Sequence, residues 1–103
     1  MLNRLMGERD ISTQNLFELA RTDRSMGFKI MKGERLPSRD VLIRVALILH
    51  LEVEQAQALL KAGHRAQLTP RDDRDAILLS CLIRRLSLAD ADELLEEAGE
   101  EAL

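Results

Sequence analysis

Aromatic residues are scarce in this sequence, which contains two Phe and neither Trp nor Tyr among its 103 residues. Proteins that bind single-stranded nucleic acids stack the bases on aromatic side chains, and aromatic cages for cations need the same side chains. The composition therefore argues against both kinds of site. The length is a second limit, because a single domain takes roughly 100 to 200 residues. One compact domain is expected, and a large multidomain enzyme is excluded.

Cysteine occurs once, so the chain cannot form an internal disulfide. Cys81 lies in an apolar run and is expected to be a small core residue of a protein in a reducing compartment. No apolar stretch approaches the roughly 18 residues that span a bilayer. The N-terminus also lacks the basic and apolar regions of a signal peptide. We expect a cytoplasmic protein with no membrane partner.

Clusters of metal-binding or catalytic residues are missing as well. His50 and His64 have no Cys or carboxylate at ligand spacing, and we expect both on the surface near helix ends. No phosphate-binding glycine loop occurs. Several carboxylates have no His-centred partner and are expected to cap helices or face solvent, namely Asp72, Asp73, Asp75, Asp90 and Asp92. The sequence predicts no metal site, no cofactor and no enzymatic activity.

Apolar residues make up 46% of the chain and charged residues 32%, which is a globular composition. The apolar spacing is helical, and no segment shows the alternation of a half-buried strand. Side chains that cap helices mark the helix starts, with Thr69-Pro70 the clearest, and the candidate N-caps are Ser12, Asp23, Ser38, Thr69 and Ser87. Gly33, Gly63 and Gly99 are expected as left-handed stops. An all-α fold is predicted, with helices over residues 2–9, 13–21, 24–32, 39–49, 53–62, 70–85 and 88–98.

Two segments of the chain resemble each other at an offset of 35 residues. Residues 39–61 align without gaps on residues 74–96, and eight of the 23 aligned residues are identical. Apolar replacements such as Leu42 for Ile77 keep the inward positions apolar. Either the chain contains two helix hairpins of one type, or two Leu-rich amphipathic hairpins match by composition alone.

Charge is distributed unevenly. Residues 1–65 contain 11 Lys and Arg against 8 Asp and Glu, a net charge of +3. Residues 66–103 contain 4 against 10, a net charge of −6. Within the first part, residues 21–35 alone have 5 basic against 2 acidic residues, again +3. Local basicity of this kind suits contact with phosphates, although a solvated helix face has the same composition.

Residues 11–51 have a definite order: a short helix, a tight turn, a short basic helix, a glycine, a proline and a long apolar helix. The pattern falls on Ser12, Leu16, Ala20, Arg21 to Asp23, Arg24 to Lys32, Gly33, Pro37, Leu42, Ala46 and Leu49. In these residues the chain resembles the Xre family of phage-repressor-like, Cro-type helix-turn-helix proteins, over about residues 2–62. The resemblance implies a five-helix DNA-binding domain over residues 1–65. Residues 66–103 would then form an acidic C-terminal helical hairpin packed on it.

The resemblance also implies where DNA would be contacted. The helix over residues 24–32 would enter the major groove, with Arg24, Ser25, Phe28 and Lys29 as base-reading candidates. Phosphate contacts would come from Thr13, Gln14, Arg21, Lys32 and Arg35. Two positions depart from the family pattern, because Gly27 stands where an aliphatic residue is usual and Arg21 where many relatives have glycine. Phe28 is interpreted either as a base reader or as a core residue that fills the space beside Gly27.

Two functions follow. The first is a transcriptional regulator that binds double-stranded DNA sequence-specifically, as a dimeric repressor on a two-fold operator. The second is a helix-turn-helix-fold interaction module, an adaptor or an antitoxin-like protein, without sequence-specific DNA binding. In a DNA-binding protein the acidic hairpin, residues 84–103 in particular, is expected to point away from the duplex. It would offer a surface for a second copy or for another protein.

Overall fold

The computed structural model describes residue 16 and residues 18–103. Its helices are α3 (Arg24–Met31), α4 (Arg39–Ile48), α5 (Val53–Ala62), α6 (Asp73–Ile83) and α7 (Leu88–Glu97). Residues 16, 18 and 19 are helical as well and end the helical segment that precedes α3. No strand occurs in this described part, which confirms the predicted all-α fold. The predicted helix over 2–9 and the start of the one over 13–21 lie outside the described residues.

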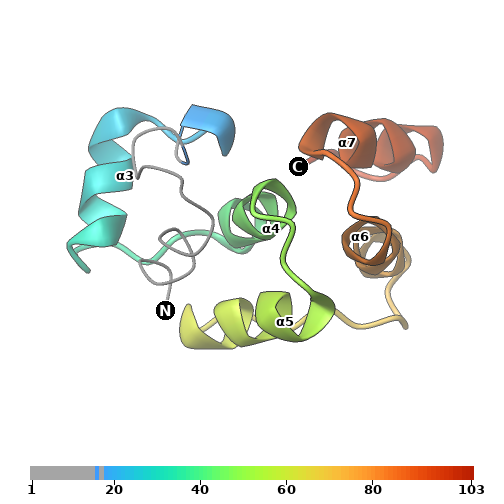
Figure 1. Cartoon of the computed structure of the whole chain (residues 1–103), viewed down its shortest axis with the longest axis horizontal. Coiled ribbons are helices and arrows are strands. Elements are labelled where there is room, and N and C mark those ends of the chain that lie inside the picture. Colours follow the sequence, from blue (N-terminus) through green and yellow to red (C-terminus); the bar gives the residue numbers. More distant parts are fainter. Residues whose placement is uncertain (1–15, 17) are drawn as a thin grey trace.

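Helix α4 is the central element of the fold. It packs against α5, α6 and α7, and Figure 1 shows it between α3 on one side and α6 with α7 on the other. A helix in that place must be apolar around most of its circumference. The sequence RDVLIRVALI meets this requirement, because the residues it buries are Leu42, Ile43, Val45, Ala46 and Leu47.

The same tight turn joins three pairs of consecutive helical segments. In each turn one residue has a left-handed backbone, with φ of 61° at Arg21, 51° at His50 and 55° at Arg85. The N–H of that residue donates to the carbonyl three residues earlier, over 3.1, 3.1 and 3.2 Å. The residue two positions later is the N-cap of the next helix, namely Asp23, Glu52 and Ser87. Since this conformation costs a non-glycine residue roughly 1–2 kcal/mol, helix packing must hold it in place.

The end of α5 differs from the prediction. Gly63 does end the helix, but its φ is −86°, and the left-handed residue is His64 with φ of 58°. Gly63 is required for a different reason. A Cβ atom at this position would lie 2.6 Å from Cδ1 of Leu42. The missing side chain therefore lets α5 approach α4 closely, whereas Gly33 and Gly99 are left-handed as predicted, with φ of 78° and 75°.

The start of α6 also differs from the prediction, since the helix begins at Asp73 and not near Pro70. Asp72 is the N-cap, and its carboxylate accepts the N–H of Asp75 at 2.9 Å. Thr69 is engaged elsewhere. Its N–H donates to Asp75 Oδ2 at 3.1 Å, and its hydroxyl accepts the N–H of Arg71 at 3.3 Å. These bonds form a turn before the helix and leave no cap at Thr69.

The internal repeat is present in three dimensions. The bounds of α5 and α7 differ by 35 at both ends, 53–62 against 88–97. We call residues 39–68 the first hairpin and residues 74–103 the second hairpin. Each hairpin donates an arginine to the other. Arg39 forms a bidentate pair with Asp75 at 2.9 and 2.8 Å, and Arg74 forms one with Asp40 at 3.1 and 3.1 Å. Such reciprocity is the mark of a two-fold relation.

The two arginines also bind matching backbone carbonyls. Nε of Arg39 donates to the Ala66 carbonyl at 2.9 Å, and Nε of Arg74 donates to the Glu101 carbonyl at 2.8 Å. Residues 66 and 101 are again 35 apart. The repeat therefore extends past the aligned helices into the segments that follow them.

The last residues of the hairpins match in the same way. Gln57 Oε1 accepts the N–H of Leu68 at 2.7 Å, and Asp92 Oδ1 accepts the N–H of Leu103 at 2.8 Å. Leu68 and Leu103 are both buried. The structure thus decides between the two interpretations of the sequence match: the hairpins share a common set of contacts, which composition alone does not produce.

Candidate nucleic-acid interface

Helix α3 is formed by local signals. The Asp23 carboxylate accepts the N–H of Met26 at 2.8 Å and so caps the first turn. Lys32 ends the helix, and left-handed Gly33 follows it. The helix begins at Arg24, so this candidate lies at its first residue.

The two faces of α3 differ in exposure. Gly27 is buried, and Ile30 and Met31 are half-buried, with Met31 packed on the core. Gly27 thus stands on the inward face, where a larger side chain would need room. The opposite face consists of exposed residues at helical spacing, which we call the α3 stripe: Ser25, Phe28, Lys29 and Lys32.

The exposure of Phe28 decides between its two interpretations. Half of its surface, 50%, is exposed, and it lies in the α3 stripe between Ser25 and Lys29. The interpretation as a core residue is therefore wrong. The space beside Gly27 lies on the other face, where Met26 is half-buried.

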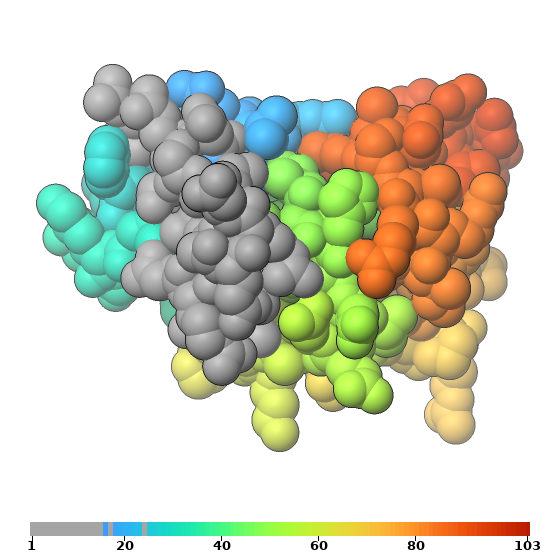
Figure 2. Space-filling view, viewed as in Figure 1, coloured from blue at the N-terminus to red at the C-terminus, as the bar shows by residue number. Residues whose placement is uncertain are grey.

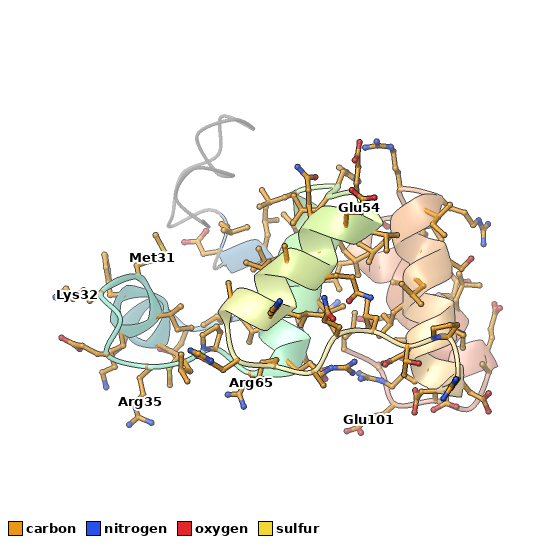
Figure 3. The ribbon with its side chains drawn as sticks, turned by 90° about the horizontal axis from the view of Figure 1, so that it is seen from below. Met31, Lys32, Arg35, Glu54, Arg65 and Glu101 are labelled. Carbon is orange, nitrogen blue, oxygen red and sulfur yellow. The ribbon has the colours of Figure 1, made fainter. Side chains whose placement is uncertain are left out.

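Basic side chains continue past the end of α3. Lys32 and Arg35 are both exposed. Arg65, which follows α5 in the chain, donates from Nε to the Pro37 carbonyl at 3.0 Å. Figure 3 shows Arg35 and Arg65 pointing toward the same edge of the molecule. The sequence analysis did not propose Arg65, because only the folded chain brings residue 65 beside residue 37.

Arg21 is not brought to the α3 stripe. Its Nη1 lies 2.6 Å from Asp92 Oδ2 and donates to the Leu103 carbonyl at 3.0 Å. The charge of Arg21 is thus paired with the second hairpin and holds the turn before α3 against α7. Thr13 and Gln14, the other two phosphate candidates, lie outside the described residues.

The turn before α3 has a second support from α4. Nη1 of Arg44 donates to the Ala20 carbonyl at 3.2 Å. Leu16 and Ala20 are completely buried, at 0% exposure, and Ala20 is small enough to permit close approach of helices. The position of α3 is therefore set by contacts on the turn from both α4 and α7.

The acidic second hairpin contacts the turn before α3 through Arg21, but it lies away from α3 itself. Figure 2 shows α3 at one end of the molecule and the second hairpin at the other, and the longest dimension is 35 Å. The Debye length at physiological salt is about 8 Å. Repulsion between the acidic hairpin and a polyanion at α3 is therefore largely screened.

Among the described residues the most deeply buried carboxylate is that of Asp75, whose side chain is 5% exposed. Burial would raise its pKa, but hydrogen bonds from Arg39 and from the Thr69 amide outweigh this effect and lower the pKa below the usual 3.8. The same pairing raises the pKa of Arg39, against the opposing effect of burial. Asp75 is thus an ionised structural partner of Arg39.

Other groups with chemical potential are dispersed. His50 and His64 are exposed directly after helix ends, as predicted, and Cys81 is a buried free thiol whose pKa is raised by burial. Within residues 16 and 18–103, no three His, Cys, Asp or Glu side chains gather as a metal site would need. None of the helices described is both long and apolar enough to cross a bilayer.

Comparison of the chain with family models, with curated proteins and with solved structures finds no match. The geometry of α3 and its surroundings is therefore the basis for the functional argument.

Proposed function

We propose that this chain binds double-stranded DNA sequence-specifically and acts as a transcriptional regulator, with α3 in the major groove. The observation that carries the proposal is the α3 stripe, a row of polar, basic and aromatic side chains on a helix whose other face packs inward. An α-helix with its side chains is about 10–12 Å in diameter. The major groove is about 12 Å wide and admits one helix.

The side chains of the α3 stripe suit base edges. Lys29 has donors for O6 and N7 of guanine, Ser25 bonds either purine, and Phe28 offers an apolar contact for a thymine methyl. An exposed aromatic ring is costly in water, and such a contact removes it from solvent. Arg24 joins this set through its place at the start of α3, the end of a recognition helix that meets bases.

Contacts to the phosphates of the DNA backbone would come from the residues around the α3 stripe. Lys32 and Arg35 follow α3, and Arg65 extends this basic edge from the other side of the Pro37 loop. Thr13 and Gln14 enter through the resemblance to Xre proteins. Each phosphate neutralised by these residues adds about 0.9 to the slope of log K against log salt.

Dimerisation belongs to the same proposal. Two copies on a two-fold operator would place their α3 helices one helical turn apart, about 34 Å. A symmetric repressor of this kind reads two inverted half-sites, so the selected DNA sequence reports on the protein's symmetry.

The test is selection from a randomised duplex pool at about 150 mM salt, a concentration at which nonspecific binding is weakened. The wild type is compared with the Phe28→Ala/Lys29→Ala variant. We expect an enriched two-fold motif with the wild type and its loss with the variant. The matched control is Arg71→Ala/Ile83→Ala, which likewise removes one basic and one apolar side chain, here at exposed positions before and at the end of α6, across α4 from α3. It should select the same motif.

Salt titration separates the two kinds of contact. Lys32→Ala should weaken all duplexes alike and lower the salt slope by about 1. No enrichment by the wild type, or equal enrichment by wild type and α3 variant, would refute base reading by α3.

A further inference from the structure

The internal repeat allows a comparison of equivalent surfaces. On the first hairpin, Leu42, Leu59, Ala62 and Gly63 line an apolar groove whose other wall comes from residues 30–37, the end of α3 and the loop after it. The first hairpin thus has the end of α3 and the following loop of the same chain beside this face. The equivalent residues of the second hairpin are Ile77, Leu94, Glu97 and Ala98.

The second hairpin also has a groove at this place, the α6–α7 groove. It is open to solvent and has a volume of about 510 Å³. Its lining residues are Ala76, Ile77, Ser80, Leu94 and Ala98, with Arg84 and Glu97. A neighbouring hollow of about 290 Å³ shares Arg84, Leu94 and Glu97 and adds Leu86, Asp90 and Glu93. Every residue that lines the two hollows belongs to the second hairpin. Among the described residues, no other segment covers them.

The floor and the rim of the α6–α7 groove have different chemistry. The floor is apolar, since Ile77 and Leu94 are half-buried and stay accessible. Ile83 follows Ser80 by three residues on α6 and is 70% exposed. The rim, by which we mean the charged residues of the groove and of the neighbouring hollow, has three carboxylates, Asp90, Glu93 and Glu97, against one guanidinium, Arg84. An apolar floor with an acidic rim is complementary to a helix with an apolar stripe and basic flanks.

The substitutions between the repeats indicate a reversible partner. Buried Val45 and Leu49 of the first hairpin correspond to Ser80 and Arg84 of the second, which are half-buried and exposed. A permanent interface keeps such positions apolar, whereas one that is often empty must tolerate water. The second hairpin retains an apolar floor but has polar residues around it, as expected for transient association.

We propose that the α6–α7 groove binds a basic amphipathic helix of a partner protein. Aliphatic residues of that helix, spaced at i, i+3 or i+4 and i+7, contact Ile77 and Leu94. Lysines or arginines beside this stripe pair with Asp90, Glu93 and Glu97. The proposal is independent of DNA binding, since α3 and the second hairpin lie at opposite ends of the molecule (Figure 1).

The test is selection of helix-forming peptides from a displayed random library against the full chain. We expect the enriched peptides to combine an aliphatic stripe with flanking Lys and Arg. The Glu93→Lys/Glu97→Lys variant should bind a selected peptide roughly tenfold more weakly, and added salt should weaken wild-type binding. The matched control, Glu54→Lys/Glu96→Lys, makes the same charge change at exposed helix residues outside the groove and should bind as the wild type does.

A second variant tests the apolar floor of the groove without reversing the charge of the rim. Ser80→Arg places a long side chain over the groove, and it should abolish peptide binding while circular dichroism and DNA binding stay unchanged. Enrichment of peptides without basic residues, or equal binding by rim variant and control, would overturn the proposal. Self-association of the wild type that is lost in the rim variant, measured by light scattering, would also overturn it, because the occupant would then be a second copy.

Discussion

The first and second hairpins have the same arrangement of helices and form reciprocal contacts, but they differ in what lies on their outer faces. On the first hairpin, Leu42 and Leu59 line a groove together with residues 30–37, and Val45 and Leu49 are buried. The second hairpin has Ser80 and Arg84 at the equivalent positions, with no cover among the described residues. The difference shows that one packing frame can be retained while one outer face is buried within the chain and the other is adapted to solvent.

The largest expected effect concerns the two reciprocal ion pairs, which are alike in geometry and unlike in burial. The side chain of Asp75 is 5% exposed and that of Asp40 34%. Arg39→Ala leaves a buried carboxylate unpaired and should lower the free energy of unfolding by about 3 kcal/mol. Arg74→Ala should cost only about 1 kcal/mol, because Asp40 regains water. Urea denaturation measures both, and equal losses would mean that burial does not separate the pairs.

The lowered pKa of Asp75 predicts how the stability of the fold depends on pH. The folded pKa of Asp75 is lower than its usual 3.8, so the unfolded chain binds the proton more readily. The stabilisation by ionised Asp75 is complete above pH 3.8 and is lost as the pH falls through the lower folded value. Wild type should therefore lose stability with acid more steeply than Asp75→Asn in this range. Parallel acid titrations by circular dichroism would contradict the assignment.

Exchanging the side chains of the equivalent residues Val45 and Ser80 tests how far burial differs between the outer faces of the two hairpins. Val45 is 1% exposed, and Val45→Ser places a hydroxyl in the core at a cost of about 2 kcal/mol. The converse change, Ser80→Val, should alter the free energy of unfolding by no more than about 0.5 kcal/mol. Thermal or urea unfolding of the two variants gives the comparison. A large loss in Ser80→Val would show that this face is already covered in the folded chain.

A smaller effect is expected where the hairpins differ in a helix end. Gly63→Ala places a Cβ 2.6 Å from the Leu42 methyl, and the adjoining groove lets that methyl shift, so the loss should be about 1 kcal/mol. The equivalent Ala98 is exposed at the end of α7, and Ala98→Gly should change stability by a few tenths of that. Urea denaturation of both variants measures these losses. An unchanged free energy of unfolding in Gly63→Ala would mean that the packing of α5 on α4 does not need a glycine at this position.

The smallest expected effect has the opposite sign. His64 and Gly99 are equivalent left-handed residues, with φ of 58° and 75°. His64→Gly relieves the backbone and should stabilise the chain by up to about 1 kcal/mol, whereas Gly99→Ala should destabilise it by a similar amount. Differential scanning calorimetry of both variants, with wild type beside them, tests whether the two helix ends are equally constrained.

Local signals made most of the helices predictable. Asp23, Ser38 and Ser87 are N-caps as expected, and the helices differ from their predicted bounds by no more than three residues. The start of α6 was mispredicted because Thr69-Pro70 has the form of a cap, whereas in the fold Asp75 takes the Thr69 amide. Left-handed arginines and histidines were not predicted either. Their conformation is set by hairpin packing, which no short window of sequence contains.

The candidate site was predictable only in part. The spacing of Ser25, Phe28 and Lys29 placed them on one helix, but whether Phe28 faces solvent depends on how α3 packs. The pairing of Arg21 with Asp92 joins residues 71 positions apart, and Arg65 reaches the Pro37 loop over 28 positions. Contacts of such range follow from tertiary structure, so charge and local pattern could not assign them.

The reciprocal arginine pairs have a consequence for how the fold responds to dilution. A two-fold contact between separate molecules is occupied only when their concentration exceeds the dissociation constant. In this chain the two partners are joined by a short linker, so the contact forms within one molecule at an effective concentration in the millimolar range. Its occupancy does not depend on how much protein is present. A single isolated chain keeps this symmetric core, and only contacts between its outer surfaces and other molecules depend on protein concentration.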